Sequence, residues 1–486
     1  MKNWFIRLQI LLILLIFASP IIFLLANKFK PHLDLIKYDL QKSEREVSYP
    51  QVSWLTTRDK AIINDKNEKL ILRGINIAST TWGPEFEQWN PLAVTYAVDN
   101  WSVNVIRTRI HEYEYVDNPA NFFFKLETQI LDPARSRGVY VILHPWFGEN
   151  QSLPDENGVK MWLAVAKRYQ NDPHILYDIF AEPRDIDRGE LINTYNSLIP
   201  QIRQVNPRSL IFVTGLDWGR EINSFLDSPL PYDNLVYRTN PYNKTGEFEG
   251  LFGRIAEIYP VFIGEFGSDD KLTMTEESVQ SLLGYADALE IGWTAWHFSD
   301  SGCPCLLSDN NLFTPTSYGQ IVLDALRGKT GVYPLPQFDL DPNKLYVYSD
   351  FFESGFSDYS WLSSIDLQNT SSVYTGSKSI QAKLAPAGGI YFHTSRNISS
   401  TDYFSFDLAV NSSITNNLTL RFRAPDDSLS SPILLSEYIT GQDDWSTVRI
   451  PTSQIDIPQI SGFMLESAAP LKQSTVVYLD QIFFSR

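Results

Sequence analysis

Eight short apolar runs, separated by longer amphipathic segments, constrain the fold of this chain more than any other feature. They lie between Trp54 and Gly328, at about one run per 30 residues. Eight strand–helix units in roughly 275 residues are typical of a (β/α)8 barrel. The runs are LILRGINI (70–77), VNVIRTRI (103–110), VYVILHPW (139–146), ILYDIFAE (175–182), SLIFVTG (209–215), NLVYRTN (234–240), PVFIGEF (260–266) and IGWTAWH (291–297).

An open, doubly wound parallel sheet is the alternative fold for such an alternation. That fold usually carries a glycine-rich phosphate-binding turn after its first strand. The first run here continues as RGINIAST, which contains no such turn. The pattern therefore favours the closed barrel, over residues 53–328.

The composition changes after Leu326. A proline-rich segment without helical periodicity, residues 329–344, indicates a linker. From residue 345 to 486, short alternating runs such as YFSFDLAV and LTLRFRA are separated by Ser, Asn, Gly and Asp. This pattern predicts an antiparallel β-sandwich as a second domain.

The N-terminus contains an apolar stretch, Leu8 to Ala26, flanked by basic residues on both sides. Its length is close to the ~20 residues that cross a bilayer as a helix. We expect residues 1–30 to be a membrane anchor, followed by a polar stalk or short helical neck over 31–52, with the catalytic domain outside the cytoplasm. A cleaved secretion signal, which would leave a secreted protein, is the alternative.

Net charge and cysteine content exclude some functions. The formal net charge of −17 argues against nucleic acids and anionic membrane surfaces as partners, because their phosphates would repel the chain. The two cysteines, Cys303 and Cys305, flank Pro304 and cannot alone form a structural zinc site. Two thiols or a small local clip fit this spacing better than a disulfide framework.

Two glutamates carry the strongest functional signal. Glu182 ends the run HILYDIFAEP, and Glu265 ends the run YPVFIGEFG. A carboxylate at the tip of a buried strand is costly to desolvate, and these two fall on the C-terminal ends of barrel strands four and seven, where active sites lie. Hydrolysis of a glycosidic bond needs two facing carboxyl groups. A structural ion-pair role is the alternative interpretation.

Several motifs, in this order along the chain, resemble those of glycoside hydrolase family 5, the cellulase-type retaining enzymes. They are RGIN, NVIR, the Glu-Pro after strand four, GLDW, PY, IGEFG, the Trp of strand eight and the tail PTSYGQIVLDAL, and together they span most of residues 70–326. The resemblance implies that Glu182 is the acid/base and Glu265 the nucleophile, with carboxyls about 5 Å apart.

The same resemblance implies roles for further residues. Arg107 would hydrogen-bond the nucleophile and keep it ionised, and Tyr242 would donate its hydroxyl to the same carboxylate. Trp296 would form the floor of the sugar subsite beside the cleaved bond. Further candidate stacking platforms are Trp218, Trp146 and Trp82.

The chain departs from the family pattern at three positions. Ala181 stands where the family has an asparagine before the acid/base, and Asn240 replaces a histidine on strand six. Trp146 occupies the position of a strand-three histidine, with His144 two residues earlier. We expect His144 and Asn240 to supply substitute hydrogen bonds in a rebuilt subsite.

The C-terminal region resembles the jelly-roll modules attached to bacterial polysaccharide enzymes, from YSDFFESGFSDYSW to VVYLDQIFF. This resemblance implies carbohydrate binding, with Trp361, Tyr359 and Tyr391 as candidate contacts. A structural spacer with packed aromatics is the alternative.

These features predict a surface-facing glycosidase acting on a β-glucan or β-mannan. Its chemistry would come from carboxylates, without a metal or organic cofactor. A non-catalytic carbohydrate-binding scaffold and a transglycosylase are the alternatives, and Ala181 is the feature that favours the scaffold.

Overall fold

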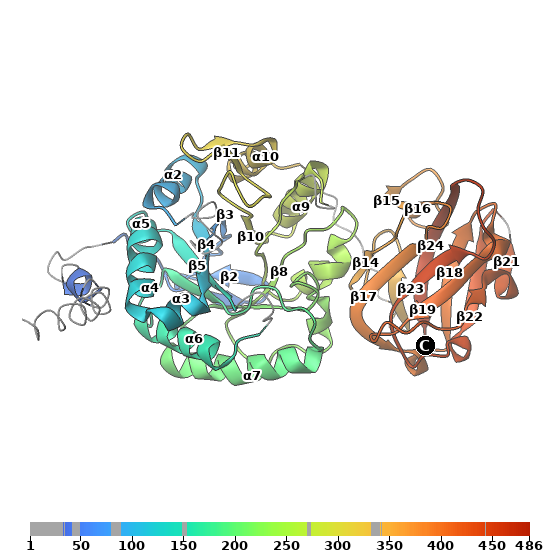
Figure 1. Ribbon diagram of the computed structural model, residues 1–486, viewed down its shortest axis with the longest axis horizontal. Helices are drawn as coiled ribbons and strands as arrows, with labels where there is room; N and C mark the ends of the chain where they lie inside the picture. Colours follow the sequence, from blue (N-terminus) through green and yellow to red (C-terminus); the bar gives the residue numbers. More distant parts are fainter. Residues whose placement is uncertain are drawn as a thin grey trace, which may run out of the picture.

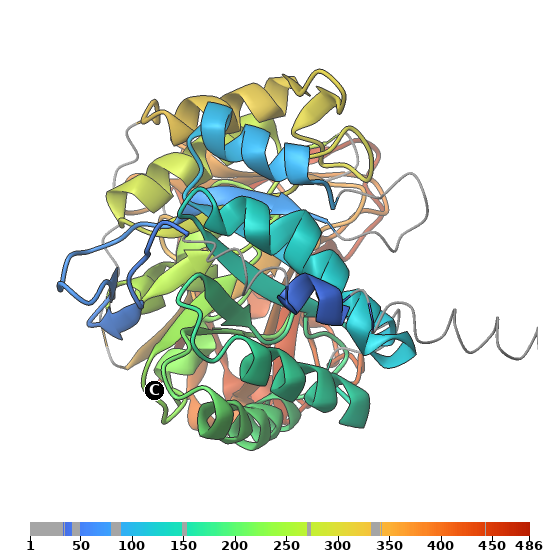
Figure 2. The same ribbon diagram turned by 90° about the vertical axis from the view of Figure 1, so that its left-hand side faces the viewer.

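The computed structural model describes residues 33, 35–40, 49–78, 89–147, 153–269, 274–331, 341, 343–442 and 444–486. A barrel and an all-β domain lie side by side along the long axis (Figure 1). In Figure 2 the barrel stands in front of the all-β domain. The predicted anchor, Leu8 to Ala26, lies outside the described residues. Within the described part of the chain, every helix is too short or too polar to span a bilayer.

Eight parallel strands close into a barrel in the order β10-β3-β4-β5-β6-β7-β8-β9. The predicted (β/α)8 barrel and all eight predicted strand positions are therefore confirmed. The strands are β3 (Arg73–Ile77), β4 (Val105–His111), β5 (Tyr140–Trp146), β6 (Ile175–Asp178), β7 (Ile211–Thr214), β8 (Leu235–Thr239), β9 (Val261–Ile263) and β10 (Gly292–Ala295).

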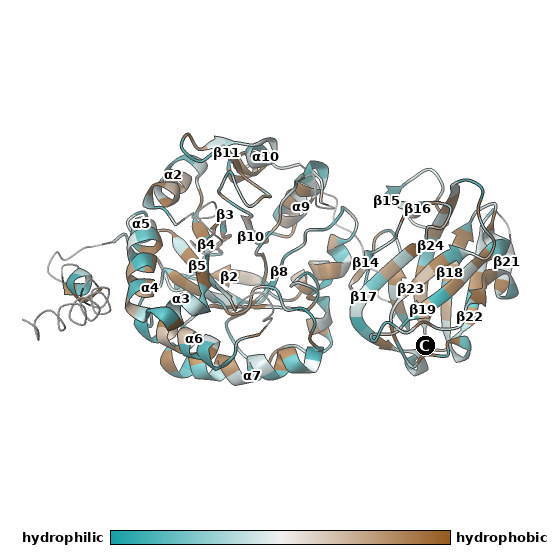
Figure 3. Ribbon diagram, viewed as in Figure 1, coloured by the Kyte–Doolittle hydropathy of each residue, from teal (hydrophilic) through white to brown (hydrophobic). Residues whose placement is uncertain are grey.

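The strands are mostly apolar because both of their faces are buried. One set of side chains, including Val105, Ile142 and Phe262, fills the barrel interior. A second, larger set packs between the strands and the surrounding helices. Figure 3 shows this difference, with hydrophobic residues along the strands and mixed polarity on the outer helices.

Helices and short hairpins surround the barrel. The helices are α2 (Pro91–Trp101), α3 (Glu112–Asp117), α4 (Pro119–Leu126), η2 (Glu127–Leu131), α5 (Asp132–Arg135), α6 (Glu156–Arg168), α7 (Arg188–Val205), η3 (Asn223–Leu226), η4 (Glu249–Gly253), α8 (Arg254–Ala256), α9 (Glu276–Ala288) and α10 (Ser317–Leu326). Two hairpins pair β1 (Thr56–Arg58) with β2 (Ala61–Ile63) and β11 (Leu307–Asp309) with β12 (Thr314–Pro315).

Residues 35–40, within the predicted stalk, are helical and contact the barrel. The Tyr38 hydroxyl donates a hydrogen bond to Asp132, which also accepts one of 2.7 Å from the Tyr49 hydroxyl. Arg168 forms a 2.9 Å ion pair with Asp39. These polar contacts hold the short helix on the barrel surface.

The C-terminal domain consists of two antiparallel sheets, as predicted. The larger contains β13 (Lys344–Tyr348), β15 (Ser364–Asn369), β16 (Ser379–Leu384), β18 (Ser405–Asn411), β21 (Ile439–Gln442), β22 (Ser446–Pro451) and β24 (Thr475–Ser485). The smaller contains β14 (Phe356–Asp358), β17 (Ile390–Ser399), β19 (Leu418–Arg423), β20 (Ile433–Leu434) and β23 (Gln459–Ser467). The short helices η5 (Ser400–Asp402), η6 (Thr415–Asn417), η7 (Leu435–Glu437) and η8 (Thr452–Gln454) connect strands.

The three aromatic residues predicted to contact sugar in this domain do not form an exposed platform. Tyr391 is buried, and its hydroxyl bonds to His393. Trp361 is half-buried, and its indole nitrogen donates to the Ala387 carbonyl. Tyr359 is 40% exposed and lies against the barrel. Tyr391 is therefore a packing residue, in agreement with the alternative of packed aromatics.

Candidate active site

Glu265 lies two residues beyond the end of β9, at the C-terminal mouth of the barrel, and is 3% exposed. Arg107 of β4 donates a 2.6 Å hydrogen bond to one carboxylate oxygen, and Tyr242 donates one of 3.3 Å to the other. Burial alone raises the pKa of Glu265, but the charges of Arg107 and Arg109 outweigh it and hold that pKa below its usual value. The two contacts predicted for this glutamate are therefore present.

A buried charge network holds Arg107 in position. Its Nε donates a 2.9 Å hydrogen bond to Asp178 of β6, and one terminal nitrogen donates one of 2.9 Å to Asn76 of β3. Arg238 of β8 reaches the same Asp178 carboxylate at 3.1 Å. All four side chains are fully buried, so the opposite charges compensate one another's desolvation. Sequence analysis missed Asp178 and Arg238, although charged residues inside apolar strand runs were a signal.

Glu182 lies four residues beyond the end of β6 and is half-buried. Arg238 fixes the backbone before it by donating to the carbonyls of Phe180 and Ala181. The Asn240 amide lies 3.4 Å from a Glu182 carboxylate oxygen, to which it donates. Burial raises the pKa of Glu182 to about 7, and the negative charge of Glu265 adds to the shift. Glu182 is therefore half-protonated near neutral pH, while Glu265 is ionised.

Arg109 is a site residue that sequence analysis did not single out. Its guanidinium carbon lies 4.8 Å from the ring centroid of Trp146 and 4.8 Å from that of Trp296, so it stands between the two indoles. It is 6% exposed, and its charge acts on both Glu182 and Glu265. The sequence VIRTRI contained a signal, because Arg107 and Arg109 are two residues apart and so lie on the same face of the strand.

The substitute hydrogen-bonding residues have different surroundings. Asn240 is fully buried; its amide oxygen accepts from Arg238 and its nitrogen faces Glu182. His144 of β5 is also buried, and neither ring nitrogen has a hydrogen-bond partner in the described part of the chain. Burial and the charges of Arg107 and Arg109 hold the pKa of His144 well below its usual value, so its ring is neutral.

The tryptophans predicted as stacking platforms are in three situations. Trp146 is half-buried at the end of β5, against Arg109. Trp218 is 46% exposed, and the guanidinium carbon of Arg184 lies 4.2 Å from its ring centroid. Trp82 lies outside the described residues.

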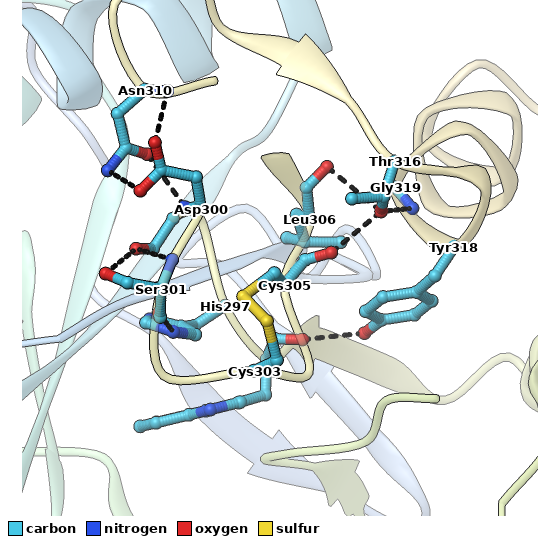
Figure 4. The surroundings of a disulfide bond; sticks show 12 residues. His297, Asp300, Ser301, Cys303, Cys305, Leu306, Asn310, Thr316, Tyr318 and Gly319 are labelled. Atoms are coloured by element: carbon cyan, nitrogen blue, oxygen red, sulfur yellow. Dashed lines mark hydrogen bonds between the residues drawn. A yellow bond between two sulfur atoms is a disulfide. The ribbon is translucent and has the colours of Figure 1, made fainter. Parts of the chain in front are cut away.

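A disulfide between Cys303 and Cys305 closes a loop after β10, near Tyr318 (Figure 4). Cys303 and Cys305 are bonded, so the local clip is confirmed and the pair of free thiols is wrong. Pro304 between them packs on the Glu265 loop, since a Cβ on Gly267 would lie 2.6 Å from the Pro304 Cβ. The Tyr318 hydroxyl lies within hydrogen-bond distance of the Phe266 and Trp296 carbonyls, at 2.8 and 2.9 Å. The loops after β9 and β10 are thereby held together.

The site offers two carboxyl groups of different protonation, a buried cation between two indoles, and a tyrosine hydroxyl. Among the described residues, no group of three or more His, Cys, Asp or Glu side chains could hold a metal ion. The arrangement is suited to general acid and nucleophilic chemistry by carboxylates.

Comparison with known proteins connects this geometry to one family model. Residues 63–302 match the model described as cellulase (glycosyl hydrolase family 5). Endoglucanase E-5 of Thermobifida fusca is 28% identical over 218 residues, which cover 41% of this chain and 46% of that protein. An endoglucanase of Clostridium saccharobutylicum is 27% identical over 251 residues, which cover 49% of this chain and 55% of that protein. The chain thus spans about half the length of these two relatives.

Solved structures share the barrel fold. The crystal structure of a β-glucanase from Saccharophagus degradans, in complex with cellotetraose, superposes with a TM-score of 0.53 at 20% sequence identity. The match covers 58% of this chain and 94% of that one. At this identity the likeness shows the fold alone.

Proposed function

Because residues 63–302 match the family model of cellulase (glycosyl hydrolase family 5), we propose that this protein hydrolyses a β-linked glucan with retention of configuration at the anomeric carbon. One observation carries the proposal. Glu265 is held ionised by Arg107, while Glu182, at the same mouth of the barrel, has a pKa of about 7. Two carboxyl groups with pKa values pushed apart by their surroundings are an acid and a nucleophile.

In the first step, the Glu265 carboxylate attacks the anomeric carbon while Glu182 gives its proton to the leaving oxygen. A glycosyl ester on Glu265 forms, and the leaving sugar departs as an alcohol. In the second step, the ionised Glu182 takes a proton from water, which displaces Glu265 and releases the sugar. Arg107 and Tyr242 compensate the Glu265 charge before the attack and after the release.

We assign the substrate to the β-glucans rather than the β-mannans. The two relatives described above are named endoglucanases, and the solved β-glucanase holds cellotetraose. The exposed indole of Trp218 suits a β-linked sugar of either kind, because an aromatic face packs on the apolar C–H face of the ring.

Ala181 favours one alternative, a scaffold that binds glucan without cleaving it. Its methyl side chain cannot hydrogen-bond to the sugar, as the family's asparagine would. Asn240 is the nearest candidate for a substitute, since its amide donates to Glu182 at the barrel mouth.

We further propose that the protein acts outside the cytoplasm, held there by the segment Leu8 to Ala26. The argument is physical, because a polymeric substrate does not cross a membrane and this segment is long enough to be an anchor.

The decisive experiment combines turnover with covalent trapping. The wild-type protein is assayed on soluble β-glucan and β-mannan and incubated with an activated 2-fluoro-cellobioside, followed by mass spectrometry of peptides. We expect β-glucan cleavage and a label on Glu265. Glu265→Gln should lower kcat by about 10³-fold or more and abolish labelling, because the covalent nucleophile is gone.

The matched control is Glu257→Gln, at an exposed glutamate beyond the end of α8. It should keep wild-type turnover and labelling. Saturable glucan binding without turnover or label in the wild type would instead identify the scaffold. A label on another residue would reject the assignment of Glu265.

A further inference from the structure

A groove of about 790 Å³ lies where the barrel and the C-terminal sandwich meet. Its barrel wall comes from the loop after Glu182, residues 184–188, and from the loop after β7, residues 216–221. Its other wall comes from β17, residues 393–397, with Asp427 and Ser461 beside them. In Figure 1, β14 and β17 are at the edge of the sandwich that faces the barrel.

Backbone contacts fix the two walls relative to each other. Phe352 N donates to Gly246 O at 3.0 Å, and Gly355 N donates to Gly250 O at 2.9 Å. A Cβ on Gly250 would lie 2.5 Å from the Phe352 carbonyl oxygen, so the backbones approach as closely as glycine allows. The groove therefore has a set shape and is not a gap between independently moving domains.

Side-chain contacts between the domains border the groove. Arg220 of the barrel donates to the Tyr359 hydroxyl of the sandwich and forms a 2.6 Å ion pair with Asp217. Arg396 of β17 forms a 2.7 Å ion pair with Asp227 of the barrel. The Arg220–Tyr359 and Arg396–Asp227 contacts thus bridge the two domains beside the groove.

The backbone on both walls is irregular at the groove. Asp217, Trp218 and Gly219 all have positive φ, at 55°, 60° and 75°. Such a conformation is costly for the two non-glycine residues, and it persists where surrounding contacts impose it. On the opposite wall, the pairing of β17 with β23 shifts between His393 and Ile398. A shift of this kind re-aims side chains, here toward the groove.

The groove lining suits a neutral sugar chain. It contains seven carboxylates against three arginines, so an anionic glycan would be repelled. Trp218 provides an indole that is 46% exposed. Ser395 is half-buried and Asn397 is exposed, and both line the sandwich wall with groups able to bond to sugar hydroxyls.

The groove lies on the Glu182 side of the site. Arg184, two residues after Glu182, lines it, and Trp218 N donates a 3.1 Å hydrogen bond to Pro183 O. In the proposed mechanism Glu182 faces the leaving oxygen. The part of the glucan that enters the groove is therefore its leaving-group side, which is released in the first step.

We infer that the C-terminal sandwich completes a binding site for the leaving-group side of a neutral β-glucan, with Ser395 and Asn397 of β17 as its sugar contacts. The inference rests on the proposed function. It gives the sandwich a role in substrate binding at the barrel rather than as a separate glycan-binding module.

The test compares a long substrate with one that has no leaving sugar. The full-length double variant Ser395→Ala/Asn397→Ala is assayed on cellohexaose and on an aryl cellobioside, whose leaving group is not a sugar. The ratio of kcat/KM for cellohexaose to that for the aryl cellobioside should fall about five- to tenfold, as loss of two hydrogen bonds predicts. Asn416→Ala, at an exposed amide of the same sandwich away from the groove, should leave this ratio unchanged.

An unchanged ratio in the double variant, with an unchanged unfolding midpoint, would overturn the inference. If the wild type cleaves neither substrate, the proposed function fails separately, and calorimetric titration with cellohexaose decides on the groove. Binding weakened by the double variant but not by Asn416→Ala would then support the groove. Equal binding by all three proteins would reject it.

Discussion

Arg107 and Glu265, 158 residues apart in the sequence, are joined by a 2.6 Å hydrogen bond in the buried mouth of the barrel. Arg107 is fully buried and is itself held by Asp178 and Asn76. The ion pair explains how a carboxylate with 3% exposure stays ionised, because the adjacent cation offsets the loss of hydration.

Replacing Arg107 with Gln should raise the pKa of Glu265, because the largest opposing charge is removed. The acidic limb of the kcat/KM profile should then move to higher pH, since the nucleophile must be ionised. We expect kcat/KM at the optimum to fall about 10²- to 10³-fold. Arg137→Gln, which breaks the exposed ion pair with Asp99, is the control and should leave the profile in place. An unshifted acidic limb in Arg107→Gln would show that another group keeps Glu265 ionised.

The alkaline limb should report Glu182. Its pKa of about 7 lies above the usual value for a glutamate, so the proton needed by the leaving oxygen is lost as the pH rises through about 7. We expect kcat/KM on cello-oligosaccharides to fall about tenfold per pH unit above that point. A dinitrophenyl cellobioside needs no protonation of its leaving group, so its kcat/KM should lack this limb. The same limb on both substrates would assign it to a different residue.

Removal of the cation between Trp146 and Trp296 should affect both limbs. Arg109 lowers the pKa of Glu182 and of Glu265, although burial and, for Glu182, the Glu265 charge act in the opposite direction. In Arg109→Ala both limbs should move to higher pH, by about one unit or more. KM should also rise, because Trp296 loses its packing partner. Arg109→Lys keeps the charge and should restore the pH profile, which a purely structural role for Arg109 would not explain.

A methyl group on Gly267 should disturb the nucleophile loop. The added Cβ would lie 2.6 Å from the Pro304 Cβ and 3.1 Å from the Trp296 carbonyl oxygen, so the two loops must separate. We expect Gly267→Ala to lower the free energy of unfolding by about 1–3 kcal/mol, measured by denaturant titration, and to lower kcat. Gly331→Ala, where the added group meets nothing within 4 Å, is the matched control and should change the free energy by less than about 0.5 kcal/mol. Equal free energies of unfolding for the two variants would show that the loops can separate without loss of stability.

The strand positions and the two glutamates could be predicted because they depend on local patterns. An apolar run of this length indicates a buried strand wherever it occurs. A carboxylate at the end of such a run indicates a functional residue, because it is costly to desolvate. The role of Tyr391 stayed open between sugar contact and packing because an alternating strand does not tell which of its faces is covered. The Cys303–Cys305 disulfide is also a local feature. The sequence left open only whether the two cysteines are free thiols or form this local clip.

The sequence by itself determined the barrel, the second β domain and the pair of carboxylates at the barrel mouth, since each is recorded in the order and spacing of neighbouring residues. Only the tertiary structure decided that Arg109 stands between Trp146 and Trp296, that Asp178 binds two arginines, and that β17 borders the same groove as Trp218. These relationships join strands and domains far apart in the chain. They depend on strand register and on packing between surfaces, which no local periodicity encodes.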